Sequence, residues 1–194
     1  MKYVSQDLEV DGLKAKILAK KFSTPIYCYS LKKIKENIAN FKKEFKKINP
    51  LICFAVKANP NLVLLREIRK LGFGADVVSM GELMIALKSG IKPNKIVFSG
   101  VGKTEIELKY AIQKKILLIN AESKSEVLMI EKIAKRKKKI VNIGLRLNPN
   151  IDPKTLSQIS TGKKENKFGV SEKGFLDLFR YIKKSKNLNF NCLS

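Results

Sequence analysis

The sequence contains no histidine and only three cysteines, Cys28, Cys53 and Cys192. Histidine and clustered cysteine are common ligands of zinc and related metals, and no two of these cysteines are spaced as Cys-x-x-Cys. We therefore expect no metal site. Two of the cysteines lie in apolar, strand-like segments and their number is odd, so we interpret all three as reduced thiols of a cytoplasmic protein.

Long hydrophobic runs are also absent. No apolar segment approaches the roughly 20 residues of a membrane-spanning helix, and the first segment, MKYVSQDLEVDGL, lacks the apolar centre of an export signal. We therefore expect no association with a membrane. The chain of 194 residues is 44% apolar, which is enough for one domain, or one domain with a piece of another, to bury a core.

Acidic residues are scarce: the chain has 17 Asp and Glu but 40 Lys and Arg, which gives a net charge of +23. Such a charge is typical of nucleic-acid-binding proteins. However, bidentate phosphate contacts favour arginine, and most basic residues here are lysines spread along helical segments. The densest run, KIAKRKKKI at 132–140, closes a predicted helix, where cations suit the helix dipole. We predict no nucleic-acid partner; a basic binding protein is the alternative, which salt-dependent retention on DNA would support.

From residue 51 onward, short apolar segments alternate with segments whose apolar residues recur at helical spacing. Gly72 and Gly90 mark helix ends, and Thr104 with Glu107 has the pattern of a capping box. Continuous apolar character is typical of parallel strands covered on both faces. The predicted strands are 51–57, 74–79, 95–100, 116–121, 141–148 and 188–194, and the predicted helices are 61–72, 81–90, 103–115, 123–138 and 174–185.

Two architectures satisfy this alternation: a doubly wound open sheet and a (β/α)8 barrel. The regular repeat and short connections favour the α/β barrel. Because a barrel has eight strands and typically about 250 residues, six strands predict a partial (β/α)8 TIM barrel and an amino-terminal fragment. The first 50 residues do not follow the repeat. They predict a short helix within 13–22, a strand at 26–30 belonging to a sheet outside the barrel, and an amphipathic helix at 31–45.

In both architectures, ligands bind at the carboxyl ends of the strands. Lys57 lies in CFAVKANPN (53–61), between an apolar strand and an Asn-Pro-Asn turn. Desolvation in an apolar cleft favours the neutral, nucleophilic amine, which suits Schiff-base formation with an aldehyde. From spacing alone, a lysine that ends a strand and reaches water is the alternative. Other residues at predicted strand ends are Asp76, Ser79, Ser99, Gly100, Asn120, Arg146 and Asn148.

Two patterns of phosphate-binding proteins are incomplete. GVGKT (100–104) ends like a P-loop, but Val97 stands where the first glycine of that loop is required. GFGADV (72–77) lacks the third glycine of a dinucleotide-binding fingerprint and precedes a strand instead of following one. We interpret GVGKT as a turn between a strand and a helix.

Seven segments occur in order along the chain: TPIYCYS, CFAVKANPN, GFGADVVSMGEL, IVFSGVGKT, LINAES, LRLNPNID and ISTGKKENKFGV. Together they resemble the diaminopimelate decarboxylases, which belong to the pyridoxal-phosphate-dependent group that includes ornithine and arginine decarboxylases. The resemblance extends over nearly the whole chain, and it implies a barrel that binds pyridoxal 5'-phosphate, here 35–194. It also implies that 1–34 is associated with a β-rich domain beyond the barrel, to which it contributes a strand.

The resemblance also implies roles for individual residues. Lys57 matches the lysine that carries the cofactor, and Asp76 and Glu82 match acidic residues near it. Arg146 matches an arginine that lines the pocket. For the last three, ordinary salt bridges of a barrel are the alternative. The loop 159–169 resembles an active-site loop that helps to close the pocket, with a solvated linker as its alternative.

The activity implied is decarboxylation of meso-2,6-diaminopimelate to L-lysine and CO2 by a homodimer, with the cofactor ring as electron sink. Two features depart from the family: the chain lacks a histidine that stacks on the cofactor in relatives, and Leu156 stands where many relatives have histidine. We expect the chain as written to be inactive alone. Decarboxylation of ornithine, arginine or carboxynorspermidine is one alternative, and a non-catalytic barrel that binds pyridoxal phosphate is another.

Overall fold

The computed structural model of the chain describes residues 2–149 and 168–194. They form two compact units, which divide between Pro50 and Leu51. The predicted boundary after residue 34 lies within the first unit, and the association of 1–34 with a further β-rich domain stays a prediction. Within the described ranges, no helix has both the length and the apolar character needed to cross a bilayer.

The first unit contains a three-stranded antiparallel sheet, in the order β1, β2, β3, followed by two helices. Both helices predicted in this part of the chain are present. The second begins where the Ser30 hydroxyl accepts the backbone N–H of Lys33. The elements are β1 (Lys2–Val4), β2 (Asp7–Val10), β3 (Leu13–Lys14), α1 (Ala15–Phe22) and α2 (Leu31–Glu44).

The segment 26–30, predicted as a strand, has no regular secondary structure. A strand is defined by hydrogen bonds to a neighbouring strand. In the part of the chain that the structure describes, no strand pairs with this segment, and the strands of this unit lie upstream of it. The structure therefore differs from the prediction here, because β-propensity without a pairing partner does not make a strand.

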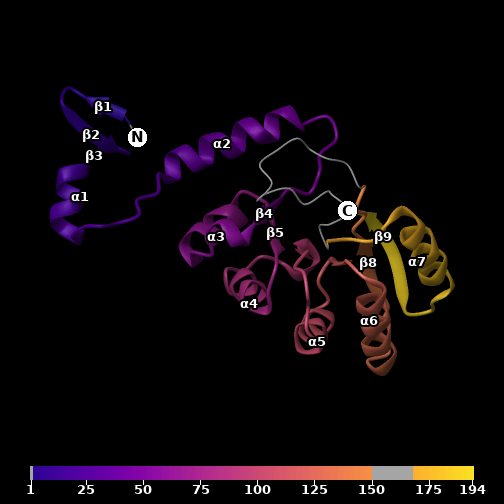
Figure 1. The fold of residues 1–194 in the computed structure, drawn as a ribbon. Coiled ribbons are helices and arrows are strands. Elements are labelled where there is room, and N and C mark those ends of the chain that lie inside the picture. The colour runs from indigo at the N-terminus through magenta and orange to yellow at the C-terminus, as the bar shows by residue number, and fades with distance from the viewer. Residues whose placement is uncertain (1, 150–167) are drawn as a thin grey trace. The chain divides into compact units, whose positions relative to one another are not determined.

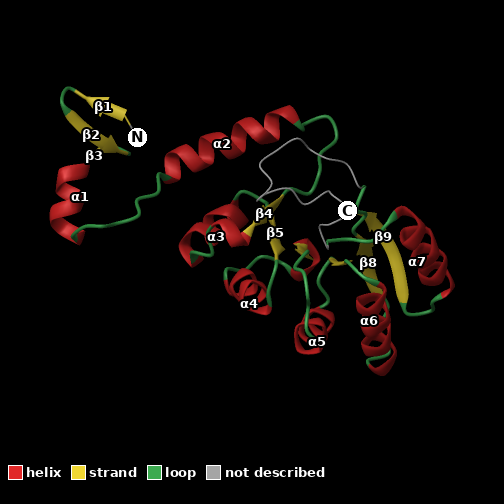
Figure 2. Ribbon diagram, viewed as in Figure 1, coloured by secondary structure: helices red, strands yellow, loops and turns green. Residues whose placement is uncertain are grey.

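The second unit is built on a six-stranded parallel sheet whose strands follow chain order, β4-β5-β6-β7-β8-β9. A doubly wound sheet reverses its strand order and carries helices on both faces, whereas sequential order with helices on one face is typical of a barrel wall. Figures 1 and 2 show α3 to α7 following one another along one side of the strands. The predicted partial (β/α)8 barrel is therefore confirmed.

All six strands and five helices predicted for this unit are present, with small differences at their ends. The strands are β4 (Cys53–Ala55), β5 (Gly74–Val77), β6 (Ile96–Phe98), β7 (Leu118–Ala121), β8 (Val141–Leu145) and β9 (Leu188–Leu193). The helices are α3 (Leu62–Lys70), α4 (Met80–Lys88), α5 (Glu105–Lys114), α6 (Lys124–Arg136) and α7 (Glu172–Lys184), with 3-10 turns η1 (Val56–Ala58) and η2 (Pro93–Lys95).

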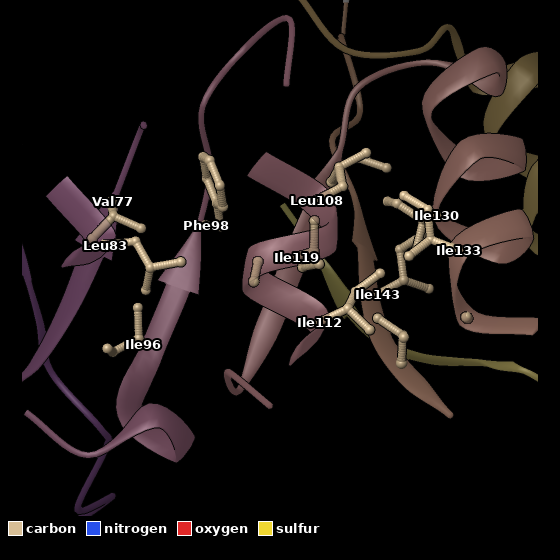
Figure 3. Close-up of a cluster of buried hydrophobic side chains, with 14 of the residues drawn as sticks. Val77, Leu83, Ile96, Phe98, Leu108, Ile112, Ile119, Ile130, Ile133 and Ile143 are labelled. Carbon is tan, nitrogen blue, oxygen red and sulfur yellow. The ribbon is translucent and has the colours of Figure 1, made fainter. Parts of the chain in front are cut away.

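The core lies between the sheet and these helices. Parallel pairing places Val77 beside Phe98 and Phe98 beside Ile119, so one face of the sheet is a continuous apolar surface. Leu83 of α4 and Leu108 of α5 pack against it, and all of these side chains are buried (Figure 3). Because burial of each such side chain contributes about 1.5–3 kcal/mol, this layer is the main source of stability of the unit.

The opposite face of the sheet differs from the prediction that both faces are apolar. Successive side chains of a strand point to opposite faces. The register pairs Ala55 with Asp76, Asp76 with Val97, and Asn120 with Gly144, so this face mixes the polar side chains of Asp76 and Asn120 with small and apolar ones. In a barrel it is the interior face, and ligands bind where this face reaches the carboxyl ends of the strands.

The predicted turns and caps between these elements are confirmed. Gly72 ends α3 with a φ of 85°, a left-handed conformation that favours glycine. The Thr104 side chain accepts the backbone N–H of Glu107, and the Glu107 carboxylate accepts that of Thr104. GVGKT is therefore a strand-to-helix turn, as predicted.

A hydrogen-bonded cluster joins α6 to α7, and we expect it to make the stability of this unit depend on pH. Burial raises the pKa of Glu131, but hydrogen bonds from Ser185 and Tyr181 and an ion pair with Lys135 outweigh burial and hold this pKa below its ordinary value of 4.5. A carboxyl with a lowered pKa in the folded state stabilises the fold above its ordinary pKa, and this contribution is lost as the pH falls through the lowered value.

The test compares urea unfolding of wild type and Glu131→Gln across this pH range. The wild type should be more stable near neutral pH, and the difference in free energy of unfolding should shrink as the pH falls below 4.5. A difference that stays constant with pH would contradict the assignment of the effect to this carboxylate.

Candidate active site

Lys57 lies at the carboxyl end of β4, the first strand of the barrel wall. The strand ends at Ala55, two residues earlier than predicted, and Lys57 lies in the 3-10 turn η1 that follows. The backbone N–H of Asn59 closes this turn on the carbonyl of Val56, at 3.0 Å, and Val56 is buried beneath it. The Lys57 side chain is exposed in this structure, so the apolar cleft expected around it is not formed by the described residues.

Two buried oxygens on the interior face have no hydrogen-bond partner among the described residues: Oδ1 of Asp76 and Oδ1 of Asn120. Asp76 lies on β5, and Asn120 lies on β7, where its amide donates to the Ser99 hydroxyl at 3.1 Å. A buried acceptor without a donor costs about 1–3 kcal/mol. Such atoms often mark a site completed by a ligand or by water, and both lie on the face predicted to meet one.

The charge of Asp76 also acts on a neighbouring strand. Cys53 on β4 lies on the interior face with Asp76, because the register pairs Ala55 with Asp76. Burial, with the negative charge of Asp76 as a second cause, raises the pKa of the Cys53 thiol to about 11. This thiol is therefore neutral near pH 7 and a poor nucleophile, so we assign it no role in catalysis.

The Glu82 carboxylate is engaged at a helix terminus. Its Oε2 accepts the backbone N–H of Val78 at 2.9 Å, while the hydroxyl of Ser79 caps α4 by accepting the N–H of Glu82. Glu107, which belongs to the next helix, accepts the N–H of Met80 at 3.0 Å. Two carboxylates and a hydroxyl thus fix the turn that follows Asp76. In this structure Glu82 shapes the rim of the site through the backbone.

Arg146 follows β8 and pairs with a carboxylate and an aromatic ring. Its Nη1 donates to Oε1 of Glu122 at 3.0 Å, and its guanidinium lies 5.5 Å from the centre of the Phe168 ring. Phe168 is held there because the nearby Val170 forms a parallel bridge with Leu147. The backbone N–H of Val170 donates to the Arg146 carbonyl, and the Val170 carbonyl accepts the backbone N–H of Asn148.

A second lysine at this end of the sheet, Lys103, is buried, in contrast to the exposed Lys57. The side chain of Lys103 is 0% exposed, and its Nζ lies 2.6 Å from both Oε1 of Glu126 and the backbone carbonyl of Asn120. The Phe98 ring lies 5.5 Å away. This lysine therefore joins the β6–α5 turn to the end of β7 and the start of α6. Lys103 belongs to GVGKT, the incomplete P-loop pattern. Because its amine is paired with Glu126, we assign it no role in phosphate binding.

Two glycines allow the interior wall to pack closely. A Cβ added to Gly100 would lie 2.2 Å from the backbone oxygen of Val78, and one added to Gly144 would lie 2.0 Å from Oδ1 of Asn120. Contacts this short do not occur, so the turns after β5 and β6 approach each other, and the Asn120 side chain approaches β8, as only glycine permits. The same closeness fixes Asn120 against the wall.

The structure thus brings Arg146 together with Glu122 and places Lys57, Asp76 and Asn120 along one end of the sheet. Glu122, Lys103 and Glu126 were not singled out from the sequence. Glu122 directly follows the predicted strand 116–121, and this position could have marked it as a site residue. Its pairing with Arg146 could not be predicted, because it depends on the register of the two strands. The predicted active-site loop 159–169 and Leu156 lie outside the described residues, apart from residues 168 and 169. Within the described ranges, no group of three or more metal-ligating side chains occurs.

Comparison with known proteins identifies relatives along most of the chain. A diaminopimelate decarboxylase of Helicobacter pylori is 52% identical over 164 residues, which are 84% of this chain and 40% of that protein. The diaminopimelate decarboxylase of Aquifex aeolicus is 43% identical over 188 residues, which are 97% of this chain and 44% of that protein. The chain therefore spans less than half the length of the curated relatives it matches.

Solved structures agree with the fold. The crystal structure of diaminopimelate decarboxylase from H. pylori complexed with L-lysine superimposes with a TM-score of 0.88 at 48% identity, covering 92% of this chain and 45% of that one. Residues 31–193 match the family described as pyridoxal-dependent decarboxylase, pyridoxal binding domain. This match covers most of the chain and agrees with the parallel sheet and the residues at its carboxyl end. The chain therefore belongs to the family of pyridoxal-dependent decarboxylases.

Proposed function

We propose that this chain forms the first part of the pyridoxal-phosphate-binding barrel of a diaminopimelate decarboxylase, which converts meso-2,6-diaminopimelate to L-lysine and CO2. The observation that carries the proposal is the position of Lys57. It is an accessible primary amine at the carboxyl end of the first barrel strand, in a chain that belongs to the pyridoxal-dependent decarboxylases. Relatives at 43% and 52% identity bear the name of this enzyme. We further propose that the full-length protein is a cytoplasmic homodimer.

The residues present fit pyridoxal phosphate. Its aldehyde requires a primary amine, which Lys57 provides, and its anionic phosphate or a substrate carboxylate requires a cation, which Arg146 provides at the same end of the sheet. The unpartnered oxygens of Asp76 and Asn120 are acceptors for N–H or O–H groups of a ligand. We propose that Lys57, Asp76, Glu82 and Arg146 form the cofactor site, with Glu82 acting through the turn that it fixes.

Each side chain has a separate task in the proposed reaction. When bound, pyridoxal phosphate supplies a ring that accepts the electron pair left as CO2 departs. Lys57 Nζ would hold the group through its primary amine at this end of the sheet. The negative charge of Asp76 favours protonated groups nearby, and the planar guanidinium of Arg146 orients an anion. The apolar layer behind the sheet excludes water from one side.

The test measures CO2 release by the full-length gene product supplied with pyridoxal phosphate. Meso-diaminopimelate should be preferred in kcat/KM over ornithine, arginine and carboxynorspermidine by roughly a hundredfold or more, because a site built for a polar group rejects an analogue that lacks it. Preference for one of the other substrates would support that alternative. Cofactor binding without CO2 release from any of them would indicate a non-catalytic barrel.

A further inference from the structure

The guanidinium of Arg146 is constrained from two directions. Glu122 Oε1 accepts from its Nη1 at 3.0 Å, and the Phe168 ring covers it at 5.5 Å. The Glu122 side chain is 8% exposed and that of Arg146 is 33% exposed, so the pair is partly withdrawn from water. A charged hydrogen bond in such a position is stronger than one on an open surface.

Glu122 is itself held by a buried ion pair. Its backbone N–H donates to Oε2 of Glu126 at 3.2 Å, and the other oxygen of Glu126 accepts from Lys103 Nζ at 2.6 Å. Lys103 Nζ also donates to the carbonyl of Asn120, two residues before Glu122. The backbone that leads to Glu122 is therefore fixed at two points, the Asn120 carbonyl and the Glu122 N–H, by Lys103 from the turn before α5 and by Glu126 of α6.

This arrangement has a consequence for Arg146. Arginine has many rotamers, and a free side chain at a strand end samples solvent-directed conformations. Glu122 restricts Arg146 because it is a buried carboxylate on a fixed backbone and requires a cation. The restriction acts before any ligand arrives, so binding of an anion loses less conformational freedom.

We propose that Glu122 is a positioning residue, which holds the Arg146 guanidinium in place to receive an anionic group of the cofactor or substrate. The proposal rests on the proposed function, because it takes Arg146 as part of the pyridoxal-phosphate site. The Glu122 carboxylate accepts a hydrogen bond from Arg146. Glu122 therefore acts through Arg146. The buried pair of Lys103 and Glu126 holds the backbone N–H of Glu122 in place.

The experiment measures the affinity of the full-length gene product for pyridoxal phosphate, by absorbance titration of Glu122→Ala, Glu122→Gln and wild type. Glu122→Ala should weaken binding about tenfold, the scale of one lost hydrogen bond to a charged group. Glu122→Gln keeps an acceptor oxygen at the same distance along the side chain, so it should recover part of the affinity. Glu131→Ala is the matched control, a buried glutamate of α6 that contacts Tyr181 and Ser185, and its affinity should be unchanged.

A double-mutant cycle with Arg146→Ala tests whether Glu122 acts through Arg146. If it does, Glu122→Ala should weaken binding in the wild-type background and have no further effect once Arg146 is alanine. Thermal unfolding of each variant separates loss of affinity from loss of fold, and Glu122→Gln is the milder variant if Glu122→Ala does not fold. Equal weakening in both backgrounds, or unchanged affinity in folded Glu122 variants, would overturn the proposal.

The outcomes distinguish this proposal from the proposed function. If the wild-type protein does not bind pyridoxal phosphate, the proposed function fails. If the wild type binds the cofactor and decarboxylates its substrate, but folded Glu122→Ala matches it in affinity, KM and kcat, the positioning role alone fails and the proposed function stands.

Discussion

Replacing Lys57 with alanine should abolish covalent retention of pyridoxal phosphate by the full-length gene product and lower turnover by about 10³-fold or more. The physical reason is that Lys57 supplies the primary amine at the carboxyl end of β4, where the barrel places its ligands. The measurement is borohydride reduction of the loaded protein, followed by peptide mapping. The cofactor should be recovered on the peptide that contains CFAVKANPN in wild type and be absent from the variant.

Two controls make this result specific. Lys57→Arg keeps the positive charge but has no amine that forms the linkage, so it should also lose the label. Lys109→Ala removes an exposed lysine, paired with Glu105 on α5, and should leave labelling unchanged. Labelling of another lysine in wild type, with the peptide around Lys57 unmodified, would refute the assignment. Lys103 is the alternative to examine first, because it lies at the same end of the sheet.

Replacing Lys103 with methionine should lower the free energy of unfolding by about 3–5 kcal/mol, the cost of leaving a buried charge without its partner. The substitution keeps the apolar stem but removes the cation from Glu126, whose carboxylate is 8% exposed. The Asn120 carbonyl loses a donor as well. The measurement is urea unfolding at neutral pH.

The double variant Lys103→Met/Glu126→Leu should be less destabilised than Lys103→Met, because it removes both charges together. The exposed pair of Lys109 and Glu105 is the matched control. Its side chains are 47% and 43% exposed, so Lys109→Met should change stability by less than about 1 kcal/mol. A Lys103→Met variant as stable as this control would show that the buried pair contributes little.

The sequence predicted most of the architecture, because the pattern that specifies it is local. Apolar runs bounded by Gly72 and Gly90 mark strands and helices, and the capping box of Thr104 and Glu107 marks the start of α5. The segment 26–30 is the exception. Its β-forming residues predict a strand, but a strand also requires a partner, and local sequence does not specify one.

The candidate site was predicted less completely. Position in the repeat was enough to place Lys57, Asp76 and Arg146 at strand ends, and the resemblance to a family added Glu82 and the roles of all four. The contacts of these residues were not predictable. Glu82 bonds to the backbone of its own turn, and Arg146 pairs with Glu122 across two strands.

The sequence by itself determined the alternation of strands and helices, the apolar face of each element and the lysine that follows the first barrel strand. These properties depend on neighbours along the chain and on the periods of helix and strand. Only the tertiary structure decided that Lys103 is buried with Glu126 and that Glu122 holds Arg146. Such pairs form between residues distant in sequence. Strand register places Glu122 beside Arg146, and the turn before α5 brings Lys103 to Glu126 of α6.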